Sequence, residues 1–312
     1  MAAMKKTRLI AALLIALGAF AATSDARGLR DRMRDRMAKR FAEQVEKDKV
    51  GGGRDYAYGA DPLQHFALWK PTAGATSAAP LILFVHGGGW KRGDMENATG
   101  RAKVEHYPAQ GYAFASVNYR LVPDATVEQQ ASDVASALKW IIGHAGELGI
   151  DPRRIVLMGH SAGAHLVALV GTDPRYLGAV GLDERDLAGV VPIDGAAYDV
   201  PKQLSIGARI MGTTYDQAFG KDPARQRALS PTFQAAAPNA PAFLILHVQR
   251  KDGIEQSRGL AEALRKAGSK VQIDDFPGNG LQGHMTINRS LGDPAYPATK
   301  VVDDWLRGRF NR

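Results

Sequence analysis

The sequence predicts an α/β fold in which a mostly parallel central sheet is covered by helices on both faces. Two observations support this prediction. Short, continuous apolar runs, typical of strands covered on both faces, alternate with segments whose apolar residues recur at helical spacing. Two of these apolar runs end directly in glycine-rich turns, and open parallel sheets carry their chemistry at the carboxyl ends of the strands.

The 312-residue chain begins with a segment that differs in composition from the rest. Three basic residues precede an apolar run over 9–22, which ends in small residues. This order is typical of a secretory signal peptide, so residues 1–26 are predicted to be a signal peptide with cleavage after Ala21 or Ala26. The alternative is an uncleaved membrane anchor, for which the run is short. We expect an exported protein, either periplasmic or secreted.

Residues 27–50 are predicted to form a charged amphipathic helix, over 27–49, and a linker. An apolar residue recurs at every fourth position of this stretch, which gives a helix a narrow apolar stripe. Such a helix either packs on the domain or on a second copy of the chain, or touches an anionic membrane face peripherally. The glycines at 51–53 form a flexible joint, and the catalytic domain is expected over 51–312.

The formal charge of +8 does not indicate a nucleic-acid partner, because most of it lies in the first 50 residues. The remaining residues carry only +2, too little for a phosphate-binding surface. The chain has no cysteine, so an exported domain must be stabilised by its core. No pair of histidines has metal-ligand spacing with a nearby carboxylate, and we expect no metal.

After the glycine joint, predicted strands and helices alternate. Strands are expected at residues 55–58, 65–69, 81–85, 113–118, 155–158, 190–193, 241–247 and 271–275. Helices are expected at residues 101–110, 127–142, 162–169, 254–267 and 298–309. The glycine- and proline-rich stretch 196–240 is predicted to be irregular and to form a lid or pocket wall. A flexible loop over 278–283 is predicted to lead to His284.

The stretch Gly-His-Ser-Ala-Gly at residues 159–163 is typical of a nucleophile elbow. It lies between an apolar strand and a helix rich in small residues. This strand–turn–helix context places the hydroxyl of Ser161 on a sharp turn above the sheet. Gly159 and Gly163 are required because the strand and the helix approach so closely that a Cβ would clash.

A second glycine-rich turn, His-Gly-Gly-Gly-Trp at residues 86–90, follows another apolar strand. Consecutive glycines let backbone N–H groups turn inward together and stabilise the oxyanion of an acyl-transfer transition state. A phosphate-binding loop is disfavoured, because neither Gly-Lys-Ser/Thr nor Gly-x-Gly-x-x-Gly is present. We predict that the oxyanion hole is formed by the N–H groups of Gly88, Gly89 and Ala162.

Together these motifs resemble the α/β-hydrolase superfamily, and within it the hormone-sensitive-lipase-like carboxylesterases and bacterial feruloyl and acetyl esterases. The resemblance extends over about residues 54–310 and lies at 58–59, 86–90, 93–94, 117–121, Asp133, 159–166, 229–231 and His284. It implies an α/β-hydrolase fold with a small lid, a Ser–Asp–His triad in that chain order, an acyl-enzyme intermediate and no cofactor. Arylformamidases share the Gly-His-Ser-Ala-Gly-Ala-His stretch.

In this resemblance Ser161 is the nucleophile and His284 is the base that removes its proton. The expected acid is Asp252, which would hold the imidazole in the required tautomer. Family members usually carry His-Gly-x-x-Asp after this strand. Here the glycine is missing and the carboxylate lies one residue further on, so the assignment assumes a one-residue insertion. Asp274 and Asp275 in the next strand are the alternatives.

Two aromatic side chains beside the motifs are candidates for substrate binding. Trp90 follows the oxyanion glycines and either contacts the acyl or alcohol part of an ester or packs under the loop. His160 directly precedes the nucleophile. His86, at the start of the glycine turn, is expected to order that turn.

The leading hypothesis is an exported serine carboxylesterase that hydrolyses small to medium carboxylic esters. Its partner is a small-molecule ester, and the sequence does not specify an oligomeric state. Amide hydrolysis by a formamidase or peptidase would use the same triad. A non-catalytic relative of the fold is the third hypothesis, and only the altered loop at 247–252 favours it.

Overall fold

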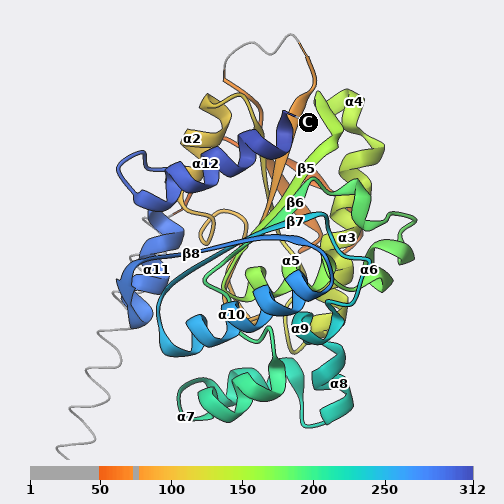
Figure 1. Cartoon of the computed structure of the whole chain (residues 1–312). Coiled ribbons are helices and arrows are strands. Elements are labelled where there is room, and N and C mark those ends of the chain that lie inside the picture. The colour runs from red at the N-terminus through yellow and green to blue at the C-terminus, as the bar shows by residue number, and fades with distance from the viewer. Residues whose placement is uncertain (1–48, 73–76, 312) are drawn as a thin grey trace, which may run out of the picture. The chain divides into compact units, whose positions relative to one another are not determined.

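The structure is a computed structural model that describes residues 49–72 and 77–311 (Figure 1). The chain divides into an N-terminal unit, residues 1–47, and the domain that follows it. The predicted signal peptide and charged helix, apart from the last residue of that helix, lie outside the described residues.

Within the described residues, eight strands form one sheet in the order β1-β2-β4-β3-β5-β6-β7-β8. β1 pairs antiparallel with β2, and β2 pairs antiparallel with β4. Every other pairing is parallel, so the predicted mostly parallel sheet is confirmed. The strands are β1 (Arg54–Ala57), β2 (His65–Trp69), β3 (Ala79–Val85), β4 (Ala113–Val117), β5 (Ile150–His160), β6 (Gly189–Ile193), β7 (Ala242–Gln249) and β8 (Lys270–Asn279).

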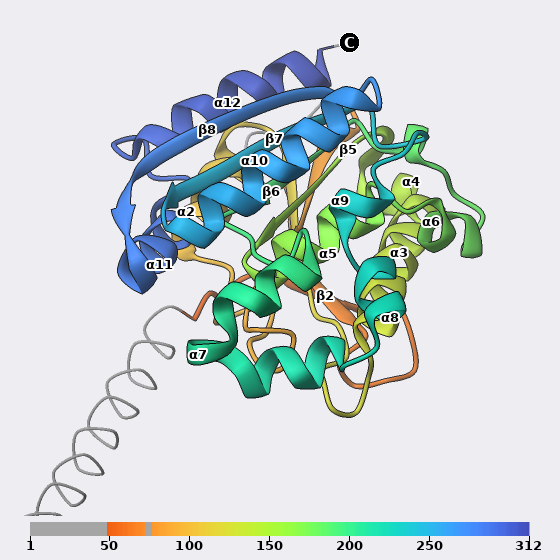
Figure 2. The same cartoon turned by 60° about the horizontal axis from the view of Figure 1, so that its bottom comes forward.

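Helices cover both faces of this sheet. α3, α5 and α10 pack on one face, and α2, α11 and α12 pack on the other (Figures 1 and 2). The helices of the described chain are α2 (Arg101–Ala109), α3 (Val127–Gly143), α4 (Ala145–Leu148), α5 (Ala162–Val170), α6 (Pro174–Ala179), α7 (Val200–Phe219), α8 (Pro223–Ala228), α9 (Pro231–Gln234), α10 (Lys251–Lys266), α11 (Gly280–Ser290) and α12 (Pro297–Phe310). None of them is long and apolar enough to cross a bilayer.

Each face of the sheet has its own apolar core, because successive residues of a strand point to opposite faces. In β3, Leu81 and Leu83 belong to one core, while Ile82 and Phe84 belong to the other. All four side chains are fully buried. Burial on both faces explains why the central strands are continuous apolar runs in the sequence.

The structure corrects the prediction that residues 196–240 are irregular. This stretch contains α7, α8 and α9, and Figure 2 shows α7 and α8 lying outside the helices that pack on the sheet. Asp199 caps α7 by accepting a backbone N–H of its first turn, and Pro201 occupies that turn. Pro223 and Pro231 occupy the first turns of α8 and α9. Proline is well tolerated there, because its missing N–H would have no partner. These prolines therefore mark helix starts.

The prediction of a flexible loop over residues 278–283 is also wrong. β8 continues to Asn279 and α11 begins at Gly280, so His284 lies inside a helix. Gly278 and Gly283 pack against each other, since a Cβ on Gly283 would lie 2.4 Å from the carbonyl carbon of Gly278. The glycines thus permit a tight strand-to-helix turn that fixes the start of α11.

Candidate active site

Ser161 lies at the turn between β5 and α5. Its backbone has φ 56° and ψ −117°, a conformation that non-glycine residues rarely adopt and that is concentrated at functional sites. A Cβ on Gly159 would lie 2.4 Å from the carbonyl oxygen of Gly163, and a Cβ on Gly163 would lie 2.0 Å from that of Val85. Only glycine fits at both positions, so the sharp strand–turn–helix expected from the sequence is present.

The glycine turn after β3 lies directly beside this serine. A Cβ on Gly87 would lie 3.1 Å from the Cβ of Ser161. Gly88 and Gly89 have φ of 132° and 64°, and neither N–H donates a hydrogen bond to another described residue. Ala162 is the first residue of α5, where a backbone N–H has no partner within the helix. The three predicted oxyanion donors thus lie in the two turns that meet at Ser161.

His86 ties the start of the glycine turn to the core. Its Nδ1–H donates to the carbonyl oxygen of Gly87 at 2.7 Å, and its ring stacks on Tyr119 with centroids 4.4 Å apart. The Tyr119 hydroxyl donates to the carbonyl oxygen of His86 at 2.9 Å. Burial lowers the pKa of His86 to about 4, so its ring is neutral near pH 7. As predicted, His86 orders the turn.

His284 faces a buried carboxylate. Its Nδ1 lies 2.5 Å from Oδ2 of Asp194, which follows β6 at a φ of 42° and has no exposed side-chain surface. The other oxygen, Oδ1, accepts the backbone N–H of Val248 at 3.1 Å. Burial alone would raise the pKa of Asp194, but the hydrogen bond from His284 and the charge of Arg250 lower it below its ordinary value. The carboxylate is therefore ionised, and Nε2 of His284 is the ring nitrogen left to take a proton.

The carboxylate that contacts His284 is Asp194, and the prediction of Asp252 for this position is wrong. Asp252 lies in the first turn of α10, with Oδ2 3.3 Å from Nη1 of Arg250 and 3.3 Å from Nε2 of Gln203. The Nε of Arg250 lies 3.0 Å from Oδ2 of Asp194. The guanidinium thus stands between the two carboxylates, and Asp252 pairs with it instead of with the histidine.

The sequence does carry a signal for Asp194. The residue directly follows an apolar strand and precedes Gly195, at the edge of the sheet where chemistry is expected. The family motif after the next strand directed the prediction to Asp252 instead. The alternatives Asp274 and Asp275 lie in β8, and no hydrogen bond of the described residues joins either to the histidine. Nothing in the motifs singled out Arg250, whose role depends on which carboxylate it meets.

His160 connects the elbow to α11. Its Nε2–H donates to the carbonyl oxygen of His284 at 3.0 Å, and the two rings lie 4.4 Å apart between centroids. Burial and the neighbouring His284 hold the pKa of His160 well below its ordinary value, so the ring is neutral. Its side chain is thus buried and links the elbow to the backbone of His284. The substrate contact expected of His160 stays a prediction.

Trp90 packs under the glycine turn, the second of the two alternatives that the sequence leaves open. Only 2% of its surface is exposed. Its Nε1–H donates to Nδ1 of His165 at 3.3 Å, and its ring meets Phe219 of α7 edge to face at 4.8 Å. His165 in turn donates its Nε2–H to the carbonyl oxygen of Leu229 at 2.8 Å, and burial lowers its pKa to about 4. The indole thereby links the turn to α7.

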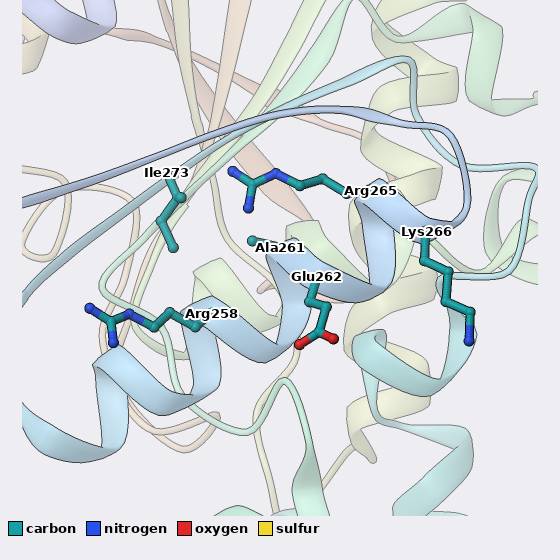
Figure 3. Close-up of a pocket in the computed structure, with 6 residues that line it drawn as sticks. All are labelled: Arg258, Ala261, Glu262, Arg265, Lys266 and Ile273. Carbon is teal, nitrogen blue, oxygen red and sulfur yellow. The ribbon is translucent and has the colours of Figure 1, made fainter.

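Outside this site, the described residues hold no metal-ligand cluster, and α10 carries a surface groove. No group of three or more histidines, cysteines or carboxylates has the arrangement of a metal site. A groove of about 580 Å³ runs between α10 and β8, lined by Arg258, Ala261, Glu262, Arg265, Lys266 and Ile273. Figure 3 shows Arg265 extending toward Ile273 while Glu262 and Lys266 point the other way. None of these residues contacts Ser161, Asp194 or His284.

The arrangement has the parts needed for acyl transfer. A hydroxyl on a strained turn lies beside backbone N–H groups that can stabilise an oxyanion. An imidazole next to that turn has one nitrogen bonded to an ionised carboxylate and the other available for a proton. No cofactor is required for such chemistry.

Comparison with known proteins identifies relatives among esterases. The sequence matches the BD-FAE family over residues 67–183. It is 32% identical over 269 residues to the esterase LipC of Mycobacterium tuberculosis, covering 82% of this chain and 66% of LipC. It is 34% identical over 276 residues to the carboxylic ester hydrolase LipN of that organism, covering 81% of this chain and 68% of LipN. Kynurenine formamidase of Drosophila melanogaster is 27% identical over 209 residues, covering 65% of this chain and 66% of that protein. The chain spans about two thirds of the length of these relatives.

Solved structures show the same fold. Esterase B from Lactobacillus rhamnosis superposes with a TM-score of 0.70 at 22% identity, covering 92% of this chain and 96% of that one. Esterase 2 of Thermogutta terrifontis with bound propionate superposes with a TM-score of 0.65 at 25% identity, covering 82% of this chain and 94% of that one.

Proposed function

The chain belongs to the esterase group of the α/β-hydrolase family, and from that premise we propose that it is a serine hydrolase of small to medium carboxylic esters. The hydrogen bond between His284 and Asp194, beside the strained turn that carries Ser161, is the observation that carries this proposal. A carboxylate–imidazole pair next to an exposed serine turn is the arrangement that activates a hydroxyl for attack on an ester.

In the proposed mechanism the Ser161 hydroxyl attacks the ester carbonyl while Nε2 of His284 takes its proton. Asp194 holds Nδ1–H and stabilises the imidazolium that forms. The N–H groups of Gly88, Gly89 and Ala162 stabilise the oxyanion. The imidazolium then protonates the leaving alcohol, which leaves an acyl-serine. Water, activated by the same imidazole, hydrolyses the acyl-serine to the acid and regenerates the enzyme.

Replacing the serine tests the mechanism. Ser161→Ala should reduce hydrolysis of p-nitrophenyl acetate and butyrate by about 10⁶-fold, down to the contribution of binding and the oxyanion hole. A fluorophosphonate probe should label the wild type but not this variant. The matched control is Ser132→Ala, which removes an exposed hydroxyl of α3 that bonds only the carbonyl oxygen of Glu128. Equal turnover and labelling in both variants would contradict the proposal.

One observation supports a short acyl group, since the solved relative from Thermogutta holds propionate. We expect kcat/KM for p-nitrophenyl esters to be highest at two to four acyl carbons, an order-of-magnitude preference over eight carbons, and a chain-length series measures it.

Amide hydrolysis is the second candidate, because kynurenine formamidase is among the relatives. The same triad cleaves amides when the pocket holds the amine leaving group. Matched substrates separate the two: 4-nitrophenyl acetate for the ester, and 4-nitroacetanilide and N-formylkynurenine for the amide and formamide. The altered loop at 247–252 was the only feature that favoured a non-catalytic role. Because the carboxylate of Asp194 bonds His284, a catalytic role does not require an acid from that loop.

Export remains part of the proposal and is supported by the basic and apolar segments of residues 1–26. Expression of the full chain in a bacterial host, followed by fractionation and mass spectrometry of the mature N-terminus, tests it. Cleavage after Ala21 or Ala26 is the expected result. Deleting residues 27–49 and measuring vesicle binding and oligomeric state tests the two suggested roles of that charged segment, peripheral membrane contact and self-association.

A further inference from the structure

Arg250 contacts both carboxylates that the site contains. It directly follows β7, and its Nε lies 3.0 Å from Oδ2 of Asp194 while its Nη1 lies 3.3 Å from Oδ2 of Asp252. Its Nη2 lies 3.4 Å from the carbonyl oxygens of Asp194 and Gly195. The side chain is only 17% exposed. All three guanidinium nitrogens are therefore engaged, and three of the four contacts are to the turn that carries Asp194.

This turn needs support from outside. Asp194 is a non-glycine residue at φ 42°, and its carboxylate is fully buried. Its Oδ2 accepts from His284 and from Arg250. A Cβ on Gly253 would lie 3.2 Å from Nη2 of Arg250 and 3.3 Å from Oδ1 of Asp194, so the guanidinium and the carboxylate are closely packed. Loss of the guanidinium would remove one of the three hydrogen bonds that hold the carboxylate and two hydrogen bonds to the carbonyl oxygens of the strained turn.

The charges around Asp194 also indicate that Arg250 supports its carboxylate. The ionisable groups that face it from the surrounding elements are His284, Arg250, Asp252, Tyr198 and Tyr296. Among these, Arg250 is the permanent cation. Without it a buried carboxylate would stand near the carboxylate of Asp252, and both burial and like charge favour the neutral acid.

We propose that Arg250 is a positioning residue that orients the carboxylate of Asp194 toward His284 and keeps it ionised, while Asp252 anchors the outer end of the guanidinium. The inference rests on the proposed ester hydrolysis. Asp252, at the place where related enzymes carry the acid, thus acts through the arginine. An ionised, fixed carboxylate matters most when the imidazolium forms, so the effect of Arg250 belongs to kcat.

Two substitutions of Arg250 in the purified full chain test this. Arg250→Gln should lower kcat for p-nitrophenyl acetate about 10- to 100-fold, with KM within about twofold, because misplaced catalytic groups cost rate more than binding. Because loss of a nearby positive charge favours proton uptake by the His284–Asp194 pair, the acid-side midpoint of the kcat/KM profile should move up by roughly half a pH unit or more. Arg250→Lys keeps the charge, so it should restore the wild-type midpoint but only part of kcat. The control is Arg258→Gln, which removes an exposed charge of α10, the helix that follows Arg250.

Each outcome of these experiments either supports or overturns the proposed role of Arg250. Wild-type kcat and midpoint in Arg250→Gln overturn the proposal, and so does a loss of kcat with no shift of the midpoint, since that would be a structural effect. If Arg250→Gln does not fold, as judged by circular dichroism, Arg250→Lys decides alone, and unchanged kcat in it overturns the proposal. Failure of the proposed function looks different, because Ser161→Ala would then retain full activity.

Discussion

At the scale of single residues, the site depends on which carboxylate meets His284. Asp194 has three hydrogen-bond donors and no exposed surface, whereas the side chain of Asp252 is 25% exposed and has two weak contacts. A buried carboxylate bonded to an imidazole fixes its tautomer and stabilises its charged form. A partly exposed ion pair contributes little by comparison, because water screens it. The two aspartates should therefore differ greatly in their effect on turnover.

Asparagine substitutions measure this difference. Asp194→Asn should lower kcat about 10⁴-fold, because an amide leaves the imidazole in the wrong tautomer. Asp252→Asn should lower it no more than about fivefold, the equivalent of one partly exposed ion pair. The readouts are kcat for p-nitrophenyl acetate and the rate of fluorophosphonate labelling. The reverse order would restore Asp252 as the acid and refute the assignment made from the structure.

At the scale of elements, the elbow works because β5, β3 and α5 approach each other at glycines. The Cβ of a residue at 163 would collide with the backbone oxygen of Val85, which cannot move without moving β3. Not every glycine inside a helix has such a neighbour. Gly259 in α10 has open space where its Cβ would be. Alanine should thus have opposite effects at these two helical positions.

Gly163→Ala should destabilise the protein by about 3 kcal/mol, a typical cost of overpacking, and should also lower kcat because the turn of Ser161 shifts. Gly259→Ala should stabilise it by about 0.5–1 kcal/mol, because alanine restricts the unfolded chain and favours a helix. Urea unfolding gives both free energies. Equal stabilities would show that the strand and the helix have room to separate.

The sequence predicts those elements whose buried apolar residues recur at a clear spacing. It does not predict elements in which prolines and glycines suggest irregular chain. The bounds of β3, β7 and α3 are predicted to within two residues, whereas the predicted strand at 155–158 covers only the apolar centre of β5. α7 is not predicted because its proline and two glycines suggest irregular chain, although that proline, Pro201, lies in the first turn. The carboxylate that meets His284 is not predicted for a physical reason: a motif fixes a residue's neighbours in the chain, but the folded structure decides which carboxylate reaches His284. Ser161 and the glycine turns needed no long-range information.

At the scale of the whole molecule, buried histidines tie stability to pH. His86 and His165 have their pKa lowered by burial to about 4, against an ordinary 6.5. The folded state binds fewer protons than the unfolded state between these values. Stability from these groups is thus complete above about pH 6.5 and is lost as the pH falls toward 4.

A glutamine at 165 isolates one of these contributions. Each histidine should cost the protein about 2 kcal/mol between pH 6.5 and pH 5. His165→Gln should be less stable than the wild type at pH 7, because it loses the contact with Trp90, but its stability should fall about 2 kcal/mol less over this interval. Urea unfolding at pH 7, 6 and 5 measures both slopes. Parallel slopes would mean that His165 already carries a proton in the folded state.

The three residues of the proposed triad are held by different parts of the sheet, with unequal support. The N–H of Ser161 donates to the carbonyl oxygen of Ile193, the residue before Asp194. The proposed nucleophile and acid therefore follow two paired central strands, β5 and β6. His284 lies on α11, the helix that follows β8, and β8 is an edge strand of the sheet. Sheet margins and the helices behind them open before central strands do. We therefore expect that heating abolishes activity by detaching α11, and with it His284, while the rest of the fold stays intact. Cooling should restore the activity.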